Sequence, residues 1–298
     1  MDLMKLTHVL GRTWAIEGSG LMGLYLLDDG RCILLDSGEL FERQALADLL
    51  SCAGLTPVGV LSSHIHTDHS INNGWLRRTF GCLTAAPAGE LYLISSSLSL
   101  KSYLYCYSPG RLEKDLGEMI FPVDCPVPPE DGSFSFCGVE FRILHTPGHS
   151  PDHISIITPD NVCYTGDAVL SNELLDAKLP YAFHLAGMMN STRRIRTLDC
   201  AAFVVSHRGI HKDIAPLADG TLALLRRRAE EIRTLVDHPM TWGEVWQAVN
   251  EHFSLLSSRP VRAALMERNL RSFLDYLVDN GELELSASRG LTILSPRS

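Results

Sequence analysis

The chain has 298 residues, 45% of them hydrophobic, which is enough to bury the core of one large domain or of one domain with a small appendage. The 35 acidic and 26 basic residues give a net charge of −9, which disfavours nucleic acid as a partner because a polyanion is repelled at long range. No apolar run approaches the ~18 residues that a membrane-spanning helix needs.

The N-terminus and the cysteines bear on the compartment. Residues 1–5 show no charged region followed by a long apolar core, so no signal peptide is predicted. The 8 cysteines are scattered singly without a C-x-x-C pair, which gives no support to a cysteine zinc site. Most lie in apolar, strand-like runs, where free buried thiols suit a reducing compartment. We therefore expect a cytoplasmic protein.

Short apolar runs separated by turn residues predict β-structure at the start of the chain. Strands are expected at 13–17, 21–27 and 31–35, and Asp28-Asp29-Gly30 predicts a hairpin between the last two. Apolar residues recur at helical spacing over 39–53, and a further short apolar strand is expected at 58–61. This alternation of strand and helix indicates an α/β fold.

Three histidines and an aspartate fall within six residues, shortly after the strand at 58–61. His64, His66 and Asp68 occupy every second position, so an extended or loop segment would keep them on one side, whereas a helix would scatter them. With His69, they offer imidazole nitrogen and carboxylate oxygen, which suit zinc, iron or manganese. A chance surface loop would not gather four such side chains behind a buried-strand pattern. The stretch predicts a metal site at the carboxyl end of a strand, where open α/β sheets place their sites.

The next stretch, 85–120, is ambiguous between a helix and a lid. Four tyrosines lie in it, and they fit either a pocket lining or the commoner packing against the body: Tyr92, Tyr103, Tyr105 and Tyr107. Four prolines between 122 and 129 then mark an irregular connection.

A second β-region follows, with strands predicted at 133–136, 139–144, 153–158 and 161–165, and another near 203–205. Three of these strand ends deliver ligand-type residues. The strand at 139–144 is followed by His145 and His149, the strand at 161–165 by Asp167, and the strand near 203–205 by His207. Gly148 and Gly166 fit tight turns beside a site.

From about residue 216 the pattern becomes helical. The predicted elements are a helix at 219–236, a second helix that starts from the capping box Thr241-Trp242-Gly243-Glu244, a third helix at 260–278, and a hairpin of 282–285 with 291–294. Three helices and a hairpin describe a winged-helix-like appendage. We therefore predict two domains, 1–215 and 216–298.

Taken together, the ligand-type residues resemble the pattern of the metallo-β-lactamase superfamily of di-metal hydrolases. The matching motifs are His64-x-His66-x-Asp68-His69, His149 in Thr-Pro-Gly-His-Ser, Asp167 in Thr-Gly-Asp, and His207 in Ser-His-Arg-Gly. Their order and gaps match over about residues 10–215, and the Asp152-His153 pair with the C-terminal tail is similar to the lactamase-β-like-2 subgroup. One departure is Arg208, which replaces a glycine of the usual Gly-His-Gly and puts a cation beside the site.

The resemblance implies a four-layer αββα sandwich with a small C-terminal winged-helix-like domain. It also implies two divalent metal ions, zinc first, with iron or manganese as alternatives. His64, His66 and His149 would hold one ion, and Asp68, His69 and His207 the other, with Asp167 bridging. A bridging hydroxide would attack the substrate, and Asp68 would steer that water or take its proton. Asp36 and His145 are candidates for orienting the ligands, and His153 is a candidate catalytic residue whose alternative role is hydrogen bonding within the next strand.

Two kinds of activity and one non-catalytic role remain open. The first is hydrolysis of a small ester, thioester or lactone, with Tyr181, Phe183 and His184 as candidate substrate contacts because the segment between Asp167 and His207 covers the site in relatives. The second is cleavage of single-stranded RNA, gripped by the arginines of the third C-terminal helix. The third is metal-bound signalling or binding with little turnover. The tail could instead cap the pocket or form a homodimer interface.

Overall fold

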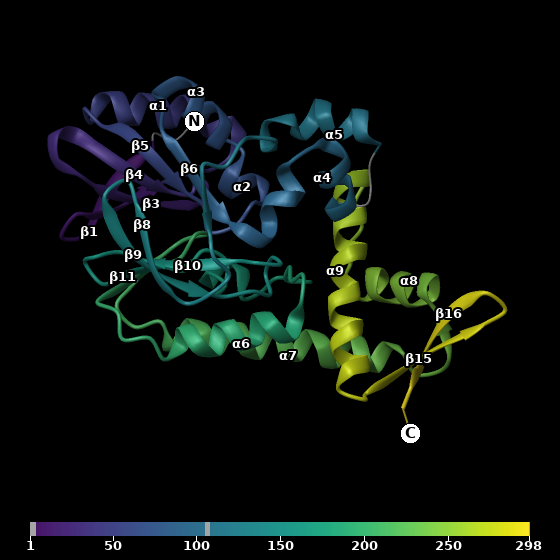
Figure 1. The fold of residues 1–298 in the computed structure, drawn as a ribbon. Coiled ribbons are helices and arrows are strands. Elements are labelled where there is room, and N and C mark those ends of the chain that lie inside the picture. Colours follow the sequence, from purple (N-terminus) through teal and green to yellow (C-terminus); the bar gives the residue numbers. More distant parts are fainter. Residues whose placement is uncertain (1–3, 105–107, 298) are drawn as a thin grey trace.

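The structure is a computed structural model of the chain and describes residues 4–104 and 108–297. Two β-sheets face each other and helices cover the outer face of each, which confirms the predicted four-layer αββα sandwich (Figure 1). Helices α1 (Arg43–Cys52) and α3 (Asn73–Phe80) cover the first sheet, and α6 (Leu185–Arg196) and α7 (Ala215–Leu235) cover the second.

The first sheet has seven strands in chain order. They are β1 (Lys5–Leu10), β2 (Thr13–Glu17), β3 (Leu21–Leu26), β4 (Arg31–Leu35), β5 (Thr56–Leu61), β6 (Leu83–Pro87) and β7 (Cys125–Val127). Strands β1 to β4 are antiparallel and β4 to β7 are parallel. The predicted hairpin is confirmed between β3 and β4, where Asp29 (φ 60) and Gly30 (φ 74) take the left-handed conformation that such a turn needs.

The second sheet has six strands in the order β13-β12-β11-β10-β9-β8. They are β8 (Gly132–Phe136), β9 (Val139–His145), β10 (Ile154–Ile157), β11 (Val162–Tyr164), β12 (Ala202–Val204) and β13 (Ile210–His211). All neighbours are antiparallel except β11 and β12, which are parallel. The carboxyl ends of β11 and β12 therefore lie at the same edge of the sheet.

Strand β4 shows how the sequence builds the layers. Ile33 and Leu35 point into the core between the two sheets, whereas Cys32 and Leu34 point to the core beneath α1 and α3. Because successive side chains alternate between faces, a strand buried on both sides must be apolar throughout. The same core accepts Leu46 and Leu50, one helical turn apart on α1.

The ambiguous stretch around residue 100 is mainly helical in its described residues, and we call residues 88–104 and 108–119 the lid segment. It contains a 3₁₀ helix (Ala88–Ile94), helices α4 (Ser97–Leu104) and α5 (Pro109–Leu116), and a 3₁₀ turn (Gly117–Met119). Its apolar side chains pack around Ile65, within the loop that carries His64 and His66. Of the four tyrosines, Tyr103 is buried and Tyr92 is exposed, while Tyr105 and Tyr107 lie outside the described residues.

The predicted C-terminal elements are confirmed. They are α7, α8 (Trp242–His252), α9 (Pro260–Asp279) and the hairpin of β15 (Leu283–Ser288) and β16 (Leu291–Pro296), with β14 (Met240–Thr241) added beside β16. Thr241 and Glu244 form the predicted capping box. One apolar cluster includes side chains of α6, α7, α8 and α9, so the tail packs directly onto the second helical layer. The division at residue 215 and the winged-helix description stay predictions. Across residues 4–104 and 108–297, no helix combines the length and apolar character that crossing a bilayer requires.

Candidate metal centre

Four loops at one edge of the sandwich carry the ligand-type residues. The His64–His69 segment follows β5, His149 lies between β9 and β10, Asp167 follows β11, and His207 follows β12. The backbone N–H of Ile154 donates to the oxygen of Ser63 over 2.9 Å, which ties the loop of the first sheet to a strand of the second. The predicted convergence at strand ends is therefore what the fold produces.

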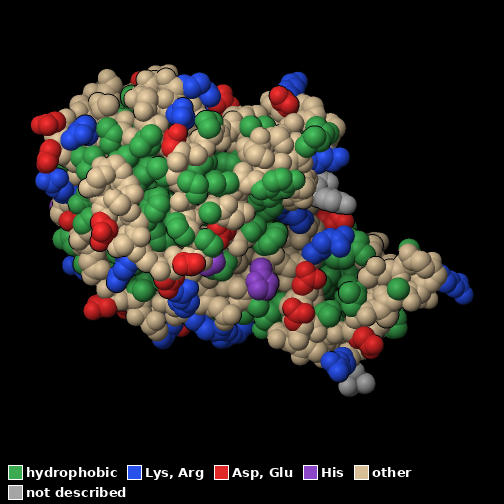
Figure 2. All heavy atoms as spheres, viewed as in Figure 1, with side chains coloured by type: hydrophobic (Ala, Val, Ile, Leu, Met, Phe, Trp, Pro, Cys, Tyr) green, Lys and Arg blue, Asp and Glu red, His purple; other side chains and the backbone are tan. Residues whose placement is uncertain are grey.

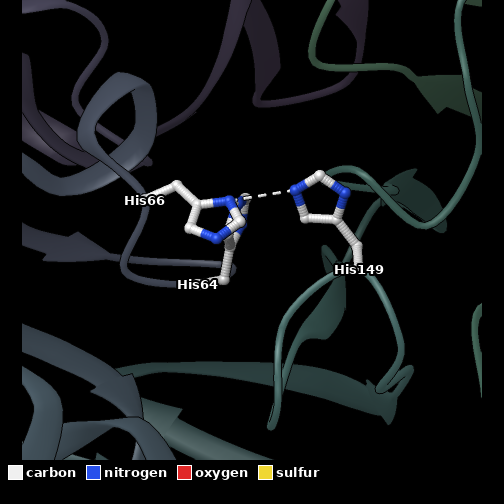
Figure 3. Close-up of side chains that lie close together, drawn as sticks. All are labelled: His64, His66 and His149. Carbon is white, nitrogen blue, oxygen red and sulfur yellow. Dashed lines mark hydrogen bonds between the residues drawn. The ribbon is translucent and has the colours of Figure 1, made fainter. Parts of the chain in front are cut away.

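The first ligand group consists of His64, His66 and His149 (Figure 3). Nδ1 of His66 stands 2.9 Å from Nε2 of His64 and 3.0 Å from Nε2 of His149. Three nitrogens held ~2.0–2.1 Å from a tetrahedral zinc ion would lie roughly 3.3 Å from one another. The spacing of this group is therefore close to that of a three-histidine zinc site.

The second ligand group consists of Asp68, His69, Asp167 and His207, whose ligand atoms all lie within 4.8 Å of one another. Nε2 of His207 is 3.0 Å from Asp167 Oδ2, and Nε2 of His69 is 3.4 Å from Asp167 Oδ1. Asp167 Oδ2 also lies 3.2 Å from Nε2 of His149 in the first group. The carboxylate of Asp167 thus lies within 3.4 Å of histidine nitrogens of both groups, as its predicted bridging role requires.

The donor atoms fit divalent metal ions. Nε2 of His69 and Oδ1 of Asp167 are buried and make no hydrogen bond, although each faces the other ligand-type atoms. Leaving buried polar atoms unpaired costs roughly 1–3 kcal/mol each, which metal coordination would offset. A set of imidazole and carboxylate donors suits zinc, and it also accepts iron or manganese.

Asp36 orients the second group, as predicted. Its Oδ2 accepts hydrogen bonds from His69 Nδ1 (2.6 Å), Ser63 Oγ (2.7 Å) and the hydroxyl of Tyr164 (2.7 Å). Because the Nδ1–H of His69 donates a hydrogen bond to Asp36, Nε2 is the ring nitrogen that faces the other side chains of the second group. Asp36 itself sits at φ 65 in a tight turn after β4.

The two groups differ in how strongly they hold protons. Burial lowers the pKa of His64 and His66 well below the ordinary value and that of His149 to about 4. Burial also opposes charge on His69, but the carboxylates of Asp68, Asp167 and Asp36 outweigh it and raise its pKa well above the ordinary value. The charge of Asp167 raises the pKa of His207 to about 9. At neutral pH the three histidines of the metal-free first group are therefore neutral, whereas His69 and His207 of the second group hold protons beside the ionised Asp68 and Asp167.

Metal occupancy of the second group should depend on pH much more steeply than that of the first. Below about pH 9 a metal ion entering the second group must displace a proton from His207, and the raised pKa of His69 adds a second proton to displace, whereas the histidines of the first group have none to lose. Each displaced proton weakens apparent affinity by up to about tenfold per pH unit. Metal analysis after equilibrium dialysis should find two equivalents at pH 8 and about one near pH 5.5. Loss of both ions together would contradict this expectation.

His153 is placed where it cannot contact substrate, which corrects its predicted catalytic role. It is fully buried and lines none of the cavities beside the ligands. Its Nε2 accepts the backbone N–H of Asp167 over 2.9 Å, and its Nδ1 contacts Thr146 Oγ1 at 2.8 Å. A Cβ at Gly166 would collide with its ring. His153 therefore positions Asp167, and the alternative of local hydrogen bonding describes it better.

His145 contacts a supporting carboxylate, Asp152, and not a member of the ligand groups. Its Nε2 is 2.7 Å from Asp152 Oδ1, and Asp152 in turn accepts the backbone N–H of Gly89 through Oδ2. This pair fastens the lid segment to the second sheet and does not orient a ligand directly. Arg208, the departure from the family pattern, is exposed and lines none of the cavities at the ligands.

Glu90 is a structural residue of the site that sequence reasoning missed. It is fully buried, and its carboxylate accepts the backbone N–H groups of Ile65 (2.9 Å) and Asp152 (3.0 Å) and the hydroxyl of Ser150. It therefore joins the loop of His64 and His66 to the loop of His149. The sequence did hold a signal, because Glu90 is the only charged residue between Arg78 and Lys101.

Burial raises the pKa of Glu90 to about 7, so this residue should make folding stability depend on pH. The unfolded chain ionises it near pH 4.5, whereas the folded chain resists ionisation until about pH 7. The stability that it contributes is thus fully present below pH 4.5 and is lost as the pH rises through 7. Relative to Glu90→Gln, metal-free wild type should lose on the order of 2–3 kcal/mol between pH 5 and 8. Urea unfolding of both proteins at each pH measures this difference, and parallel pH curves would refute it.

Besides a small cavity of about 150 Å³ beside Asp68 and His69, two larger and mainly apolar cavities meet at the ligand groups. The larger, about 560 Å³, is lined mainly by Val169, Leu170, Leu179, Leu255, Leu256 and Met266, and we call it the leucine cavity. The smaller, about 380 Å³, is lined by Tyr103, Leu116, Met119, Leu265 and Arg268, and we call it the tyrosine cavity. Both also include His149, Asp167, Tyr181 and His207. The ligand groups are therefore open to two different apolar spaces.

The three predicted substrate contacts are distributed unevenly. Tyr181 stands at the junction of the two cavities, with its ring 5.2 Å from that of His149. Phe183 is exposed, lies 5.9 Å from the ring of Tyr103 and lines neither cavity. His184 lines a separate cavity with Trp242 and Arg271. The predictions for Phe183 and His184 are therefore corrected, because neither side chain lines a cavity at the ligand groups.

Comparison with known proteins agrees with this geometry. The model of the metallo-beta-lactamase superfamily matches residues 17–207, a span that contains all seven ligand-type residues. An atrochrysone carboxyl ACP thioesterase of Aspergillus fumigatus is 26% identical over 227 residues, which cover 74% of this chain and 45% of that protein. A lactamase-like protein of Pestalotiopsis microspora is 29% identical over 204 residues, 66% of this chain and 52% of that protein. The chain thus spans about half the length of these curated relatives.

Solved structures show the same fold over nearly the whole chain. A metallo-beta-lactamase family protein of Thermus thermophilus superposes with a TM-score of 0.71 at 20% identity, covering 99% of this chain and 98% of that one. A beta-lactamase domain protein of Burkholderia ambifaria gives 0.72 at 20% identity, with 98% and 94% covered. Both likenesses include the C-terminal helices and hairpin. On the family match, the ligand groups and the sandwich, this chain belongs to the metallo-beta-lactamase superfamily.

Proposed function

We propose that this chain is a hydrolase of acyl thioesters that uses two divalent metal ions, with zinc as the first candidate. The observation that carries the proposal is the meeting of two apolar cavities at the ligand groups. A thioester has two arms, and its reacting carbon lies where they join. The leucine cavity, which is the larger, would take the acyl group, and the tyrosine cavity would take the thiol arm. Relatives named as thioesterases support this choice among ester, thioester and lactone.

The chain's own residues would bind, orient and move a proton. Metal ions held by the two groups would polarise the acyl carbonyl and make water a better nucleophile at neutral pH. Tyr181 would hold the substrate at the junction of the cavities. Burial acts to raise the pKa of Asp68, but the charge of His69 and its hydrogen bond outweigh burial and hold the pKa below its usual range. Asp68 is therefore ionised, borders the tyrosine cavity, and is our candidate acceptor for the proton of the attacking water.

The alternative of a single-strand endoribonuclease draws no support from the arginines of α9. Arg268 lines the tyrosine cavity, Arg262 lines the leucine cavity, and the exposed Arg271 stacks on Trp242 at 3.8 Å, so the three arginines of α9 lie in three different places. On the face in Figure 2, Lys and Arg side chains are interspersed with Asp and Glu. A binding protein with little turnover is the other alternative, and the assay below distinguishes it.

The test is turnover of a panel of acyl thioesters, esters and lactones by the purified, zinc-loaded protein, with metal content measured in the same sample. We expect thioester hydrolysis that a chelator abolishes and that zinc restores, and that is lost in His66→Ala. A labelled single-stranded RNA in the same buffer tests the nuclease alternative. A fully metal-loaded protein that hydrolyses no member of the panel would overturn the proposal and favour the binding role.

A further inference from the structure

His66 presents only one of its ring nitrogens to the ligand groups. Nδ1 faces His64 and His149 at 2.9 and 3.0 Å, so Nδ1 is the atom offered to a metal ion. In a neutral imidazole with Nδ1 unprotonated, Nε2 carries the proton and needs an acceptor. Without an acceptor, the ring is free to take the other tautomer, which cannot bind metal through Nδ1.

That acceptor is the phenol of Tyr103, which belongs to the lid segment. Its oxygen lies 2.8 Å from Nε2 of His66, and the two rings are stacked with centroids 6.1 Å apart. Tyr103 is 7% exposed, so water does not readily replace it. Its own proton has an acceptor in the hydroxyl of Tyr181, 3.4 Å away. The phenol can therefore accept from His66 without leaving its hydrogen unpaired.

Tyr103 is itself held from the C-terminal tail. The guanidinium of Arg268 on α9 donates through Nη1 to the backbone oxygen of Tyr103 and through Nη2 to the hydroxyl of Tyr181. Its Cζ lies 4.5 Å from the centroid of the Tyr103 ring and 5.5 Å from that of Tyr181. Helix α9 stands beside α4 and α5 in Figure 1. The planar guanidinium of Arg268 thus fixes the backbone and the ring of Tyr103 together, and a lysine ammonium could not reproduce this arrangement.

We propose that Tyr103 and Arg268 are positioning residues of the metal centre. Tyr103 fixes the tautomer and orientation of His66, and Arg268 fixes Tyr103. The C-terminal tail then completes a metal site whose ligands all come from the sandwich. The proposal concerns metal affinity and does not depend on the reaction proposed above, so a negative result in the substrate panel would leave it standing.

The test is zinc affinity of the metal-free protein, measured by competition with a chromophoric chelator at pH 7.5. Tyr103→Phe removes only the acceptor oxygen, and we expect affinity at the first ligand group to fall about 10–100-fold. Arg268→Met should cause a smaller loss in the same direction. Because Arg268 acts through Tyr103, the double variant should lose no more than Tyr103→Phe alone. Circular dichroism of each variant confirms that it is folded.

Arg271→Met is the matched control. It lies on the same helix, but its guanidinium stacks on Trp242 at 3.8 Å instead of reaching the lid segment. It should change thermal stability and leave zinc affinity within about twofold of wild type. Unchanged affinity in a folded Tyr103→Phe would overturn the proposal, as would fully additive losses or an equal loss in Arg271→Met. Should Arg268→Met fail to fold, Tyr103→Phe still tests the role of the phenol. Arg268→Lys then tests the role of the guanidinium, because it keeps the charge and removes the pair of hydrogen bonds, and it should lower zinc affinity.

Discussion

Replacing Asp167 with asparagine will lower kcat/KM for acyl thioesters by about 10²–10³-fold and leave one tightly bound metal ion instead of two. Asp167 is the side chain whose carboxylate reaches His69, His149 and His207, at 3.4, 3.2 and 3.0 Å. An amide keeps the shape of the side chain but removes its negative charge. It also turns an N–H₂ group, which repels a cation, toward one of the two groups. The second group should therefore lose metal first, and turnover should fall with it.

The matched control for this substitution is Asp152→Asn. Asp152 is about as buried as Asp167, at 6% against 4% exposed, and it lies in the neighbouring loop. Its side-chain partners are His145 and the backbone N–H of Gly89, and neither belongs to the two ligand groups. We expect it to keep two metal ions and to retain kcat/KM within about tenfold. If Asp167→Asn keeps two tightly bound ions and near wild-type turnover, the bridging role is refuted. If Asp152→Asn loses as much kcat/KM as Asp167→Asn, any buried carboxylate of these loops is equally critical.

The ligand-type residues could be found from sequence because their chemistry restricts them to a few side-chain types at the ends of recognisable strands. His64 to His69 follow a run of four apolar residues, and Asp167 and His207 each follow another. Parallel pairing of β11 with β12 then brings the last two to one edge. The direction in which a histidine ring points is a different question, because it depends on packing. His153 and His184 were misplaced for this reason: one is enclosed by Gly166 and Thr146, the other faces Trp242.

The supporting residues of the site were harder to predict, since none of them has a fixed spacing from a ligand. Tyr103 reaches His66 across 37 positions of the chain, and Arg268 reaches Tyr103 across 165. Such contacts depend on how the lid segment and α9 pack on the sandwich, which periodicity does not encode. Arg268 in particular lies among the acidic and basic residues of an amphipathic helix. From sequence alone it is one of the arginines of the third C-terminal helix that could grip RNA.

Neighbouring residues on α9 allow the two cavities to be blocked one at a time. Met266 lines the leucine cavity and Leu265 lines the tyrosine cavity. If the leucine cavity holds the acyl group, Met266→Trp will abolish the preference for long acyl chains. An octanoyl chain has six more methylenes than an acetyl group, and at about 0.8 kcal/mol each their burial stabilises the complex by at most roughly 5 kcal/mol. Losing even half of that would lower kcat/KM for the octanoyl thioester by about 50–100-fold and hardly affect the acetyl thioester.

Leu265→Trp should produce the complementary result. Acyl-chain preference should persist, because the leucine cavity is untouched, while kcat/KM should fall for a bulky thiol arm relative to a small one. Measuring both variants against octanoyl and acetyl thioesters of one large and one small thiol separates the two arms. Each variant serves as the folding control for the other, since both place the same tryptophan on the same helix. If Leu265→Trp removes the acyl-chain preference and Met266→Trp does not, the acyl group lies in the tyrosine cavity. Equal losses on all four substrates would show that the two cavities do not discriminate the arms of the substrate.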